Sequence, residues 1–360
     1  MAERRRVVVA MSGGVDSSVA AALLVQQGYE VIGIMLRLWS EPEEEAANRC
    51  CTPEAMTLAR RVAARLGIPF YAVDAQQIFR QTVVEQFIAA YGRGETPNPC
   101  LVCNRLIRWD FLLKHALALG ADFLATGHYA RLLPPVPTVE DAPRQLLRGL
   151  DRLKDQSYVL SVLNQAQLRH ALFPLGEYTK PQVRQLGRDF GLPVAERADS
   201  QDLCFVGEGD YRRFLRRYAP QVEAPGPILT RSGRQIGRHN GLAFYTIGQR
   251  KGLGISAAEP LYVLAKDTAR NALIVGTAAE LGGQELTARQ VNWIAGEPPA
   301  APLRLQVKIR YRASEAWGLV TPLDGGRAHV RFDAPLRDIT PGQQAVFYAG
   351  EVVLGGGVIE

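Results

Sequence analysis

The first part of the chain alternates between short apolar runs and longer segments whose apolar residues recur at helical spacing. Several of the helix-like segments are followed by a glycine, as at Gly28, Gly67 and Gly120, which is a common helix stop. This alternation predicts an α/β fold with a parallel sheet, helices on both faces and ligands at the carboxyl ends of the strands. The expected strands are Arg6–Met11, Glu30–Leu36, Phe70–Asp74 and Phe123–Thr126, and the expected helices are Ser17–Gln27, Pro53–Leu66, Ile78–Tyr91 and Arg105–Leu119.

The composition of the chain changes from about Pro225, where glycines become frequent. After about Gly276, apolar and polar residues alternate. Short alternating strands between close turns, such as Asp324-Gly325-Gly326, predict a small antiparallel β-barrel. The strand-like runs are Gly226–Leu229, Gly241–Thr246, Leu303–Tyr311, Ala328–Phe332 and Ala345–Tyr348. The proline-rich stretch Leu133–Pro143 predicts a surface loop or the tip of a hairpin.

The first expected strand ends in the segment Ser12-Gly13-Gly14-Val15-Asp16-Ser17-Ser18, which leads into the first expected helix. A glycine turn at a helix N-terminus aims unpaired backbone N–H groups and the positive end of the helix dipole at one point, which favours phosphate binding. The lysine of a G-x-x-x-x-G-K-[ST] loop is absent here. The segment resembles the pyrophosphate loop of the N-type ATP pyrophosphatases, and the alternative is a tight turn without a ligand.

Composition narrows the class of protein. The 360 residues suffice for two or three domains, and a hydrophobic fraction of 47% with a charged fraction of 22% is typical of a globular protein. No apolar run is long enough to cross a bilayer or to form a signal peptide, so we expect a cytoplasmic protein without a membrane partner. The net charge of +6 favours a polyanionic partner.

The odd number of five cysteines argues against a disulfide framework. Cys100 and Cys103 come just before the helix expected near Asn104, where the helix dipole lowers the pKa of a thiol. The alternatives are a zinc knuckle, which needs a second ligand pair, a thioredoxin-like redox pair and a buried inert pair. Cys204 alone is typical of a core cysteine, and the adjacent Cys50 and Cys51 favour a structural or loop role.

Taken together, these motifs resemble the bacterial tRNA-specific 2-thiouridylase family. The resemblance runs in order from Val7 to near the C-terminus. Its motifs are Ser12–Ser18, Asn98-Pro99-x-x-x-Cys103-Asn104, Ala125–Ala130, Lys154–Ser157, Ser200-x-Asp202-x-Cys204-Phe205, Tyr245–Gly254 and Pro341–Gln343. The resemblance implies a Rossmann-like adenine-nucleotide-binding domain over residues 1–206, a small central α+β domain that contacts tRNA over residues 207–275 and a β-barrel domain over residues 276–360.

The implied reaction is the ATP-dependent replacement of the C2 oxygen of the wobble uridine by sulfur, in tRNAs for lysine, glutamate and glutamine. The uridine oxygen attacks the α-phosphate of ATP, pyrophosphate leaves, and a sulfur nucleophile then displaces AMP. By the resemblance, Cys204 carries a persulfide supplied by a cysteine desulfurase or a sulfur-relay protein. Cys103 is the partner thiol, which attacks first or releases the sulfur by forming a transient disulfide with Cys204.

The resemblance also assigns binding residues, with Asp16 as the candidate to place Mg²⁺ beside the phosphates of ATP. The expected ATP-binding residues are Ala10, Met11, Ser12, Gly13, Gly14, Val15, Asp16, Ser17, Met35 and Gly127. The expected tRNA-binding residues are Asn98, Pro99, Cys100, His128, Lys154, Asp155, Gln156, Arg310, Tyr311 and Gln343. A core role for Met35, a structural role for His128 and an ordinary charged strand at Arg310–Arg312 are the competing interpretations.

The chain departs from some members of the family at Cys100, where those members have an aspartate. Cys100, Cys103 and Cys204 together could hold a [4Fe–4S] cluster whose unique iron carries the sulfur, as an alternative to the persulfide. Competing functions are another adenylating ligase, which would not need Cys103 and Cys204, a tRNA-binding module that consumes no ATP, and a cysteine-based redox protein, which leaves the phosphate loop unexplained.

Overall fold

A computed structural model describes residues 4–41, 52–133, 143–198, 203–206 and 210–360. Within them, a five-stranded parallel sheet has the order β3-β2-β1-β4-β7. The strand order reverses between β1 and β4, so a crevice opens at the carboxyl ends of these two strands. The strands are β1 (Arg6–Ala10), β2 (Glu30–Arg37), β3 (Phe70–Asp74), β4 (Phe123–Ala125) and β7 (Ala171–Leu172).

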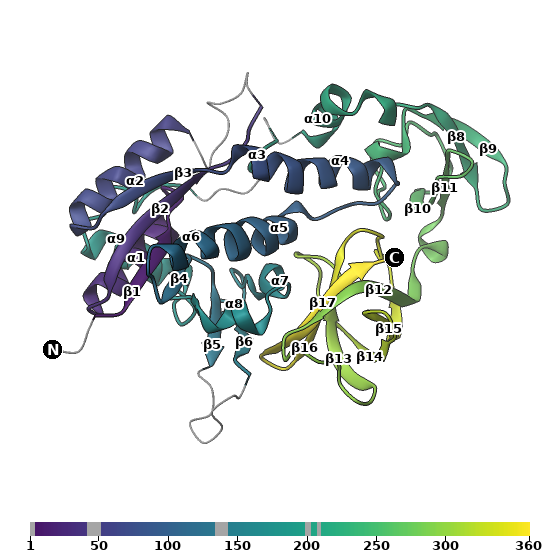
Figure 1. Cartoon of the computed structure of the whole chain (residues 1–360). Helices are drawn as coiled ribbons and strands as arrows, with labels where there is room; N and C mark the ends of the chain where they lie inside the picture. The colour runs from purple at the N-terminus through teal and green to yellow at the C-terminus, as the bar shows by residue number, and fades with distance from the viewer. Residues whose placement is uncertain (1–3, 42–51, 134–142, 199–202, 207–209) are drawn as a thin grey trace.

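Successive residues of β1 face opposite sides of this sheet, and both sides are covered. Val7 and Val9 pack in the core with α1, α2 and α9, whereas Val8 packs in a second core with the helical segment around Leu112. Figure 1 shows these layers at the N-terminal end of the molecule. The three helices of the first side are α1 (Val15–Gln26), α2 (Pro53–Leu66) and α9 (Lys180–Asp189). The four predicted strands and the first two predicted helices are confirmed.

The third and fourth predicted helices are also present, but each contains a wide π-helical stretch. The first runs through α3 (Gln76–Phe79), a π-helix (Arg80–Val84) and α4 (Glu85–Gly92), and the second through α5 (Pro99–Val102), a π-helix (Cys103–Leu112) and α6 (Leu113–Ala118). The second helix begins earlier than predicted, because the Asn98 side chain accepts a hydrogen bond from the Cys100 amide at 3.1 Å and Pro99 takes the first helical position.

A smaller four-stranded sheet, with the order β10-β11-β8-β9, follows α10 (Tyr211–Tyr218). Its strands are β8 (Gly226–Thr230), β9 (Gln235–His239), β10 (Tyr262–Asp267) and β11 (Ala272–Gly276). The strand-like interpretation of Gly241–Thr246 is wrong, because Leu242–Phe244 forms a 3₁₀-helix. Three consecutive apolar side chains are buried there, which a helical turn allows and an alternating strand does not.

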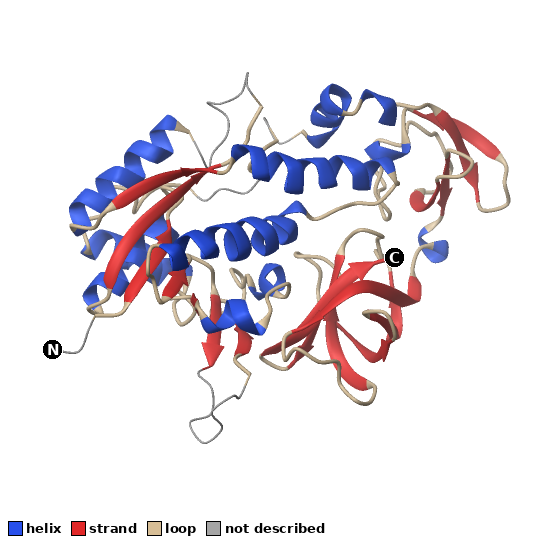
Figure 2. Ribbon diagram, in the orientation of Figure 1, coloured by secondary structure: helices blue, strands red, loops and turns tan. Residues whose placement is uncertain are grey.

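The C-terminal strands form the predicted antiparallel barrel, which closes because β12 pairs with β17 as well as with β15 (Figures 1 and 2). Its strands are β12 (Gly283–Trp293), β13 (Leu303–Lys308), β14 (Ala316–Leu323), β15 (Arg327–Leu336), β16 (Gln344–Ala349) and β17 (Val352–Ile359). The hairpin of β5 (Ala130–Leu133) and β6 (Gln145–Arg148), which flanks the predicted loop, adds to β17 at Leu147. The exact domain boundaries stay a prediction.

Short helices complete the described fold: α7 (Ser157–Leu160), α8 (Gln165–Arg169) and the 3₁₀-helices Pro220–Val222 and Ala278–Glu280. Across the described residues, every helix is too short or too polar to cross a membrane.

Candidate active site

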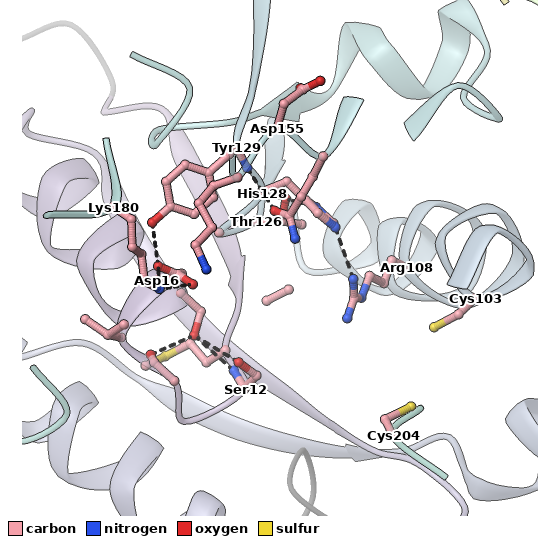
Figure 3. A pocket seen from close by; sticks show the side chains of 18 of the residues that line it. Ser12, Asp16, Cys103, Arg108, Thr126, His128, Tyr129, Asp155, Lys180 and Cys204 are labelled. Atoms are coloured by element: carbon pink, nitrogen blue, oxygen red, sulfur yellow. Dashed lines mark hydrogen bonds and ion pairs between the residues drawn. The ribbon is translucent and has the colours of Figure 1, made fainter. Parts of the chain in front are cut away.

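A cavity of about 640 Å³ lies at the carboxyl ends of β1 and β4, where the strand order predicts a ligand. Its floor is the loop after β1, which contributes Ser12, Gly14, Asp16 and Ser17. The remaining walls come from residues far apart in the sequence, and Figure 3 shows part of this lining. They are Cys103 and Arg108, Thr126–Tyr129, Arg152–Gln156, Lys180, Arg197, Cys204, Lys308 and Tyr311–Ala313.

The loop after β1 is shaped as an anion-binding turn. Gly13 has a φ of +71°, and a Cβ atom added to it would lie 2.4 Å from the carbonyl oxygen of Ala55, so the turn requires glycine there. Gly14 caps α1 without a side chain, which leaves the first N–H groups of the helix without a side-chain partner. The hydroxyls of Ser17 and Ser18 both donate to the Gly14 carbonyl, at 3.3 and 2.8 Å, and hold the turn together.

Asp16, in the first turn of α1, binds a lysine from a distant helix. The Lys180 ammonium group lies 2.7 Å from Oδ1 and 2.8 Å from Oδ2 of Asp16, and the Tyr129 hydroxyl donates to Oδ1 at 2.7 Å (Figure 3). Only 10% of the Lys180 side chain is exposed, against 34% of Asp16. A nearly buried ammonium group thus stands next to the N-terminus of α1, where a phosphate would bind.

Two further contacts connect this loop to the residues around α9. Arg197 donates from Nη1 to the Gly13 carbonyl oxygen at 2.7 Å, which places a guanidinium group beside the glycine turn. The backbone amide of Lys180 donates to Asp151 Oδ2 at 2.9 Å, so the first turn of α9 is fixed to the loop that carries Lys154. Cationic groups from three separate segments therefore surround the anion-binding turn, which suits a polyphosphate.

Gly127 follows β4 and packs directly on the start of α1. A Cβ atom added to Gly127 would lie 2.7 Å from the Ser17 amide nitrogen and 2.9 Å from the Asp16 carbonyl carbon. The absence of a side chain thus lets the β1 and β4 loops meet in the cavity. Any larger residue at position 127 would push the loop of Asp16 out of place.

His128 is buried in the cavity wall, with both ring nitrogens bonded. Arg108 donates from Nη1 to Nε2 at 3.1 Å, and because Nε2 accepts, Nδ1 carries the proton and donates to Thr126 Oγ1 at 2.7 Å. Burial, with a contribution from the Arg108 charge, holds the pKa of His128 well below its usual range. His128 is therefore neutral, and its contacts match the structural interpretation given above.

Cys103 and Cys204 lie on different segments but line the same cavity. Cys103 is buried at the start of its π-helix and Cys204 is half-buried, and neither forms a disulfide. Figure 3 shows the two thiols at one end of the cavity and Asp16 at the other. Two cysteines about one hundred residues apart in the sequence therefore line the same cavity as the predicted phosphate loop, and their approach to bonding distance stays a prediction.

Cys100 is exposed and is not among the residues that line the cavity. In the described parts of the chain, no three or more His, Cys, Asp and Glu side chains are grouped so as to hold a metal ion. Cys100, Cys103 and Cys204 as placed do not form the ligand set that a [4Fe–4S] cluster needs. Cys50 and Cys51 lie outside the described residues.

Three family models match consecutive parts of the chain. By their descriptions they are a tRNA methyl transferase HUP domain over residues 5–208, a tRNA methyl transferase PRC-barrel domain over residues 212–277 and an aminomethyltransferase beta-barrel domain over residues 283–359.

Relatives that match along the full length of the chain identify its family more specifically than the domain models do. The tRNA-specific 2-thiouridylase MnmA of Magnetococcus marinus is 51% identical over 361 residues and covers 100% of both chains. The protein of the same name from Moorella thermoacetica is 52% identical over 357 residues, which is 98% of this chain and 99% of the relative. The chain belongs to the tRNA-specific 2-thiouridylase family. A solved 4-thiouridine synthetase–RNA complex with bound ATP is 15% identical, covers 60% of this chain and 51% of its own, and has a TM-score of 0.35, too low to bear on the site.

Most of the residues that the thiouridylase resemblance assigns to ATP line the cavity, and Gly13 and Met35 do not. The cavity is lined by Ala10, Met11, Ser12, Gly14, Val15, Asp16, Ser17 and Gly127. Gly13 does not line the cavity, but its positive φ gives the turn its shape. Met35 is only 1% exposed and packs in the core with β1 and α1, because β2 alternates and turns Ile34 and Leu36 toward the cavity instead. The Met35 side chain thus has a core position, and its contact with the nucleotide stays a prediction.

The Lys154-Asp155-Gln156 loop lines the cavity, but two of its side chains hold the loop itself. Asp155 is buried and accepts hydrogen bonds from the Gly149 amide at 2.9 Å and from the Ser157 amide at 3.0 Å. Gln156 accepts from the Tyr129 amide at 3.0 Å. Lys154 adds a basic side chain to the cavity lining, and the three tRNA contacts stay predictions.

Two barrel residues that are predicted to contact tRNA form hydrogen bonds between parts of the protein in this structure. Arg310 lies outside the cavity and donates to the Ile247 carbonyl oxygen at 3.1 Å and to Thr340, which fastens the barrel to the central sheet region. Gln343 donates to the Thr96 carbonyl oxygen at 2.7 Å, just before the Asn98-Pro99 turn. Asn98 and Pro99 form the start of α5 and do not line the cavity, whereas Tyr311 lines it.

Sequence reasoning missed Lys180, Arg197 and the role of Arg108. Lys180 lies 164 positions after its partner Asp16, in a segment that reads as an ordinary amphipathic helix. The Thr179–Gln182 capping box predicts that a helix starts at Lys180, but it does not indicate the contact with Asp16.

Proposed function

We propose that this protein transfers sulfur to C2 of the wobble uridine of tRNA in an ATP-dependent reaction, releasing AMP and pyrophosphate. The observation that carries the proposal is that an anion-binding loop and two cysteine side chains line one cavity. An adenylating enzyme without sulfur chemistry has no use for the thiols, and a redox protein has no use for the loop. The full-length relatives named tRNA-specific 2-thiouridylase support the same reaction.

In the first step, the uridine C2 oxygen attacks the α-phosphorus of ATP and the bond to the β-phosphate oxygen breaks. Negative charge develops on the leaving pyrophosphate, where the N–H groups of α1 and the Lys180 ammonium group stabilise it. Arg197 keeps the Gly13 carbonyl oxygen turned away from this anion by binding it. The product is an adenylated uridine whose C2 is an electrophile with AMP as the leaving group.

The loop fits a Mg²⁺–nucleotide, since Asp16 offers a partly exposed carboxylate beside the phosphate position. Mg²⁺ there would neutralise phosphate charge together with the phosphate oxygens. Lys180 balances the charge of Asp16 in the nucleotide-free arrangement, and it is placed to turn toward the phosphates when the carboxylate acquires another partner.

In the second step, the terminal sulfur of a Cys204 persulfide attacks C2 and the bond to the AMP oxygen breaks. The Cys103 thiolate then attacks Sγ of Cys204, which frees the 2-thiouridine and leaves a Cys103–Cys204 disulfide. A thiol reductant returns this disulfide to two thiols, and a protein persulfide of the kind made by cysteine desulfurases or sulfur-relay proteins reloads Cys204. The half-buried position of Cys204 at the cavity wall allows both contacts.

The test is a complete reaction with purified protein, unmodified tRNA, ATP, Mg²⁺, a persulfide donor and a thiol reductant under anaerobic conditions. Mass analysis of the nucleosides is expected to show 2-thiouridine in amounts equal to the AMP released. Running tRNAs for lysine, glutamate and glutamine beside an unrelated tRNA tests the substrate set. Unmodified uridine in every tRNA, with AMP still formed on another acceptor, would assign the protein to the adenylating ligases.

A further inference from the structure

Leu153 is the most exposed large apolar side chain of the described residues, at 95% of its full surface. It stands on a turn that is held firmly from below. Asp151 Oδ1 accepts from the Leu153 amide at 3.0 Å and from the Lys154 amide at 3.3 Å, while Oδ2 accepts from the Lys180 amide at 2.9 Å. An apolar side chain on so well anchored a turn is presented to solvent rather than free to fold back.

This turn forms one side of the rim of the active-site cavity, with Arg152 and Lys154 on either side of Leu153. The barrel supplies further basic groups on this side, Lys308 at the end of β13 and Arg312 in the loop that follows, together with the half-exposed Tyr311. Tyr311 lies close enough to Lys154 and Asp155 for their charges to act on its pKa, so the two loops face one another across the rim. Arg152 is paired with Glu351, and an apolar tip beside several basic side chains suits an RNA strand, whose bases and phosphates need both.

A uridine in an anticodon loop stacks on its neighbours, and its C2 oxygen cannot reach a phosphate at the floor of the cavity while it stays there. It has to be turned out of the stack, which leaves a gap between the neighbouring bases. Apolar side chains inserted between bases fill such gaps in other nucleic-acid complexes.

We propose that Leu153 is a wedge that enters the anticodon stack and takes the place of the wobble uridine when this base enters the cavity. Arg152 and Lys154 hold the phosphates on either side of the wedge. The inference rests on the proposed function, because it needs a base as the group that enters the cavity. Leu153 acts through the position of the RNA and does not touch the reacting atoms, so it is a positioning residue.

The experiment compares wild-type protein with Leu153→Ser, using tRNA that carries 2-aminopurine next to the wobble uridine. Insertion of Leu153 unstacks the 2-aminopurine and raises its fluorescence in the wild-type complex, and we expect most of this rise to be lost in Leu153→Ser. We also expect kcat/KM for tRNA to fall about tenfold, as for the loss of one buried leucine side chain. Leu153→Met, which keeps an apolar tip, should restore both readings.

Two controls make the result decisive. Leu150→Ser changes a half-exposed leucine of the same loop that does not line the cavity, and it should leave both readings unchanged. A tRNA with an abasic site next to the wobble uridine needs no wedge, so Leu153→Ser should approach wild-type kcat/KM on this substrate.

Equal fluorescence and equal kcat/KM in wild type and Leu153→Ser would overturn the wedge while wild-type thiolation upholds the proposed function. A defect of Leu153→Ser that is equally large on the abasic tRNA would also overturn it, and would point to docking of the sulfur donor at this tip. A wild-type protein that forms no 2-thiouridine would instead reject the proposed function.

Discussion

The ammonium group of Lys180 lies within 2.8 Å of both carboxylate oxygens of Asp16, although α9 and α1 are separated by most of the N-terminal sheet region in the sequence. The P-loop lysine that the glycine turn lacks is thus supplied by another helix. This pair places a nearly buried positive charge beside the glycine turn, where the proposed reaction needs a group that stabilises the leaving pyrophosphate.

Lys180→Gln should therefore reduce tRNA-dependent AMP formation by about a hundred- to a thousandfold, the usual effect of removing one group that stabilises developing charge. Initial rates of AMP release at saturating tRNA measure this. Lys114→Gln is the matched control, since it breaks an exposed lysine–aspartate pair of 2.8 Å whose members do not line the cavity. Equal activity of the two variants would remove Lys180 from the adenylation step.

Serine substitutions of the three described cysteines should affect different steps of the proposed reaction. Cys204→Ser is expected to abolish 2-thiouridine while AMP and pyrophosphate are still formed, because the thiol acts after adenylation. Cys103→Ser should form the adenylate as well but stop before product release. Cys100→Ser should keep at least about half of the activity, since Cys100 lies outside the cavity lining. Loss of thiolation in Cys100→Ser, with iron bound to the wild type, would favour the cluster mechanism instead.

The parts of the site that the sequence could predict are those made by local structure. Gly13, Gly14 and Asp16 sit in one strand–turn–helix unit, whose glycines and helix start can be read from adjacent residues. The pairing of Cys103 with Cys204 depended on family resemblance, because nothing in the local sequence of either segment points to the other.

Other features of the site depend on tertiary structure, and the tRNA contacts assigned to Arg310 and Gln343 stay predictions. Arg310 and Gln343 have side chains that suit RNA, but the fold uses them to join the barrel to the rest of the protein. Lys180 could not be found, because only the packing of α9 on α1 brings it to the loop. Sequence indicates which side chains can bind an anion, whereas packing decides which of them face the cavity.

His128 should make the stability of the protein depend on pH in the acid range. Its folded-state pKa lies well below the ordinary 6.5, so the unfolded chain takes up a proton below about pH 6.5 that the folded protein cannot. The stability is therefore complete above pH 6.5 and falls with pH below it, by up to about 1.4 kcal/mol per unit. Urea midpoints between pH 7 and pH 5 should fall less steeply in His128→Gln. The exposed His115→Gln should keep the wild-type slope, and parallel curves for all three proteins would contradict a buried neutral His128.

The burial of Lys266, on β10, should lower the free energy of unfolding, and a substitution should recover this loss. Burial lowers its pKa to about 8, and its Nζ has no hydrogen-bond partner in the described structure. Lys266→Met keeps the length of the side chain and removes the buried charge, so we expect the free energy of unfolding at pH 7 to rise by about 1–3 kcal/mol.

The sign of the pH dependence identifies the cause of this gain. Between pH 8 and the ordinary pKa of 10.5, the unfolded chain binds a proton at Lys266 that the folded protein has released, so the wild type gains stability as the pH rises. The advantage of Lys266→Met should therefore be full below pH 8 and shrink toward pH 10.5. Urea unfolding of both proteins at pH 7 and pH 10 measures the difference, with the exposed Lys114→Met as the control. A gain that is the same at both pH values would assign it to apolar packing of the methionine rather than to the buried charge.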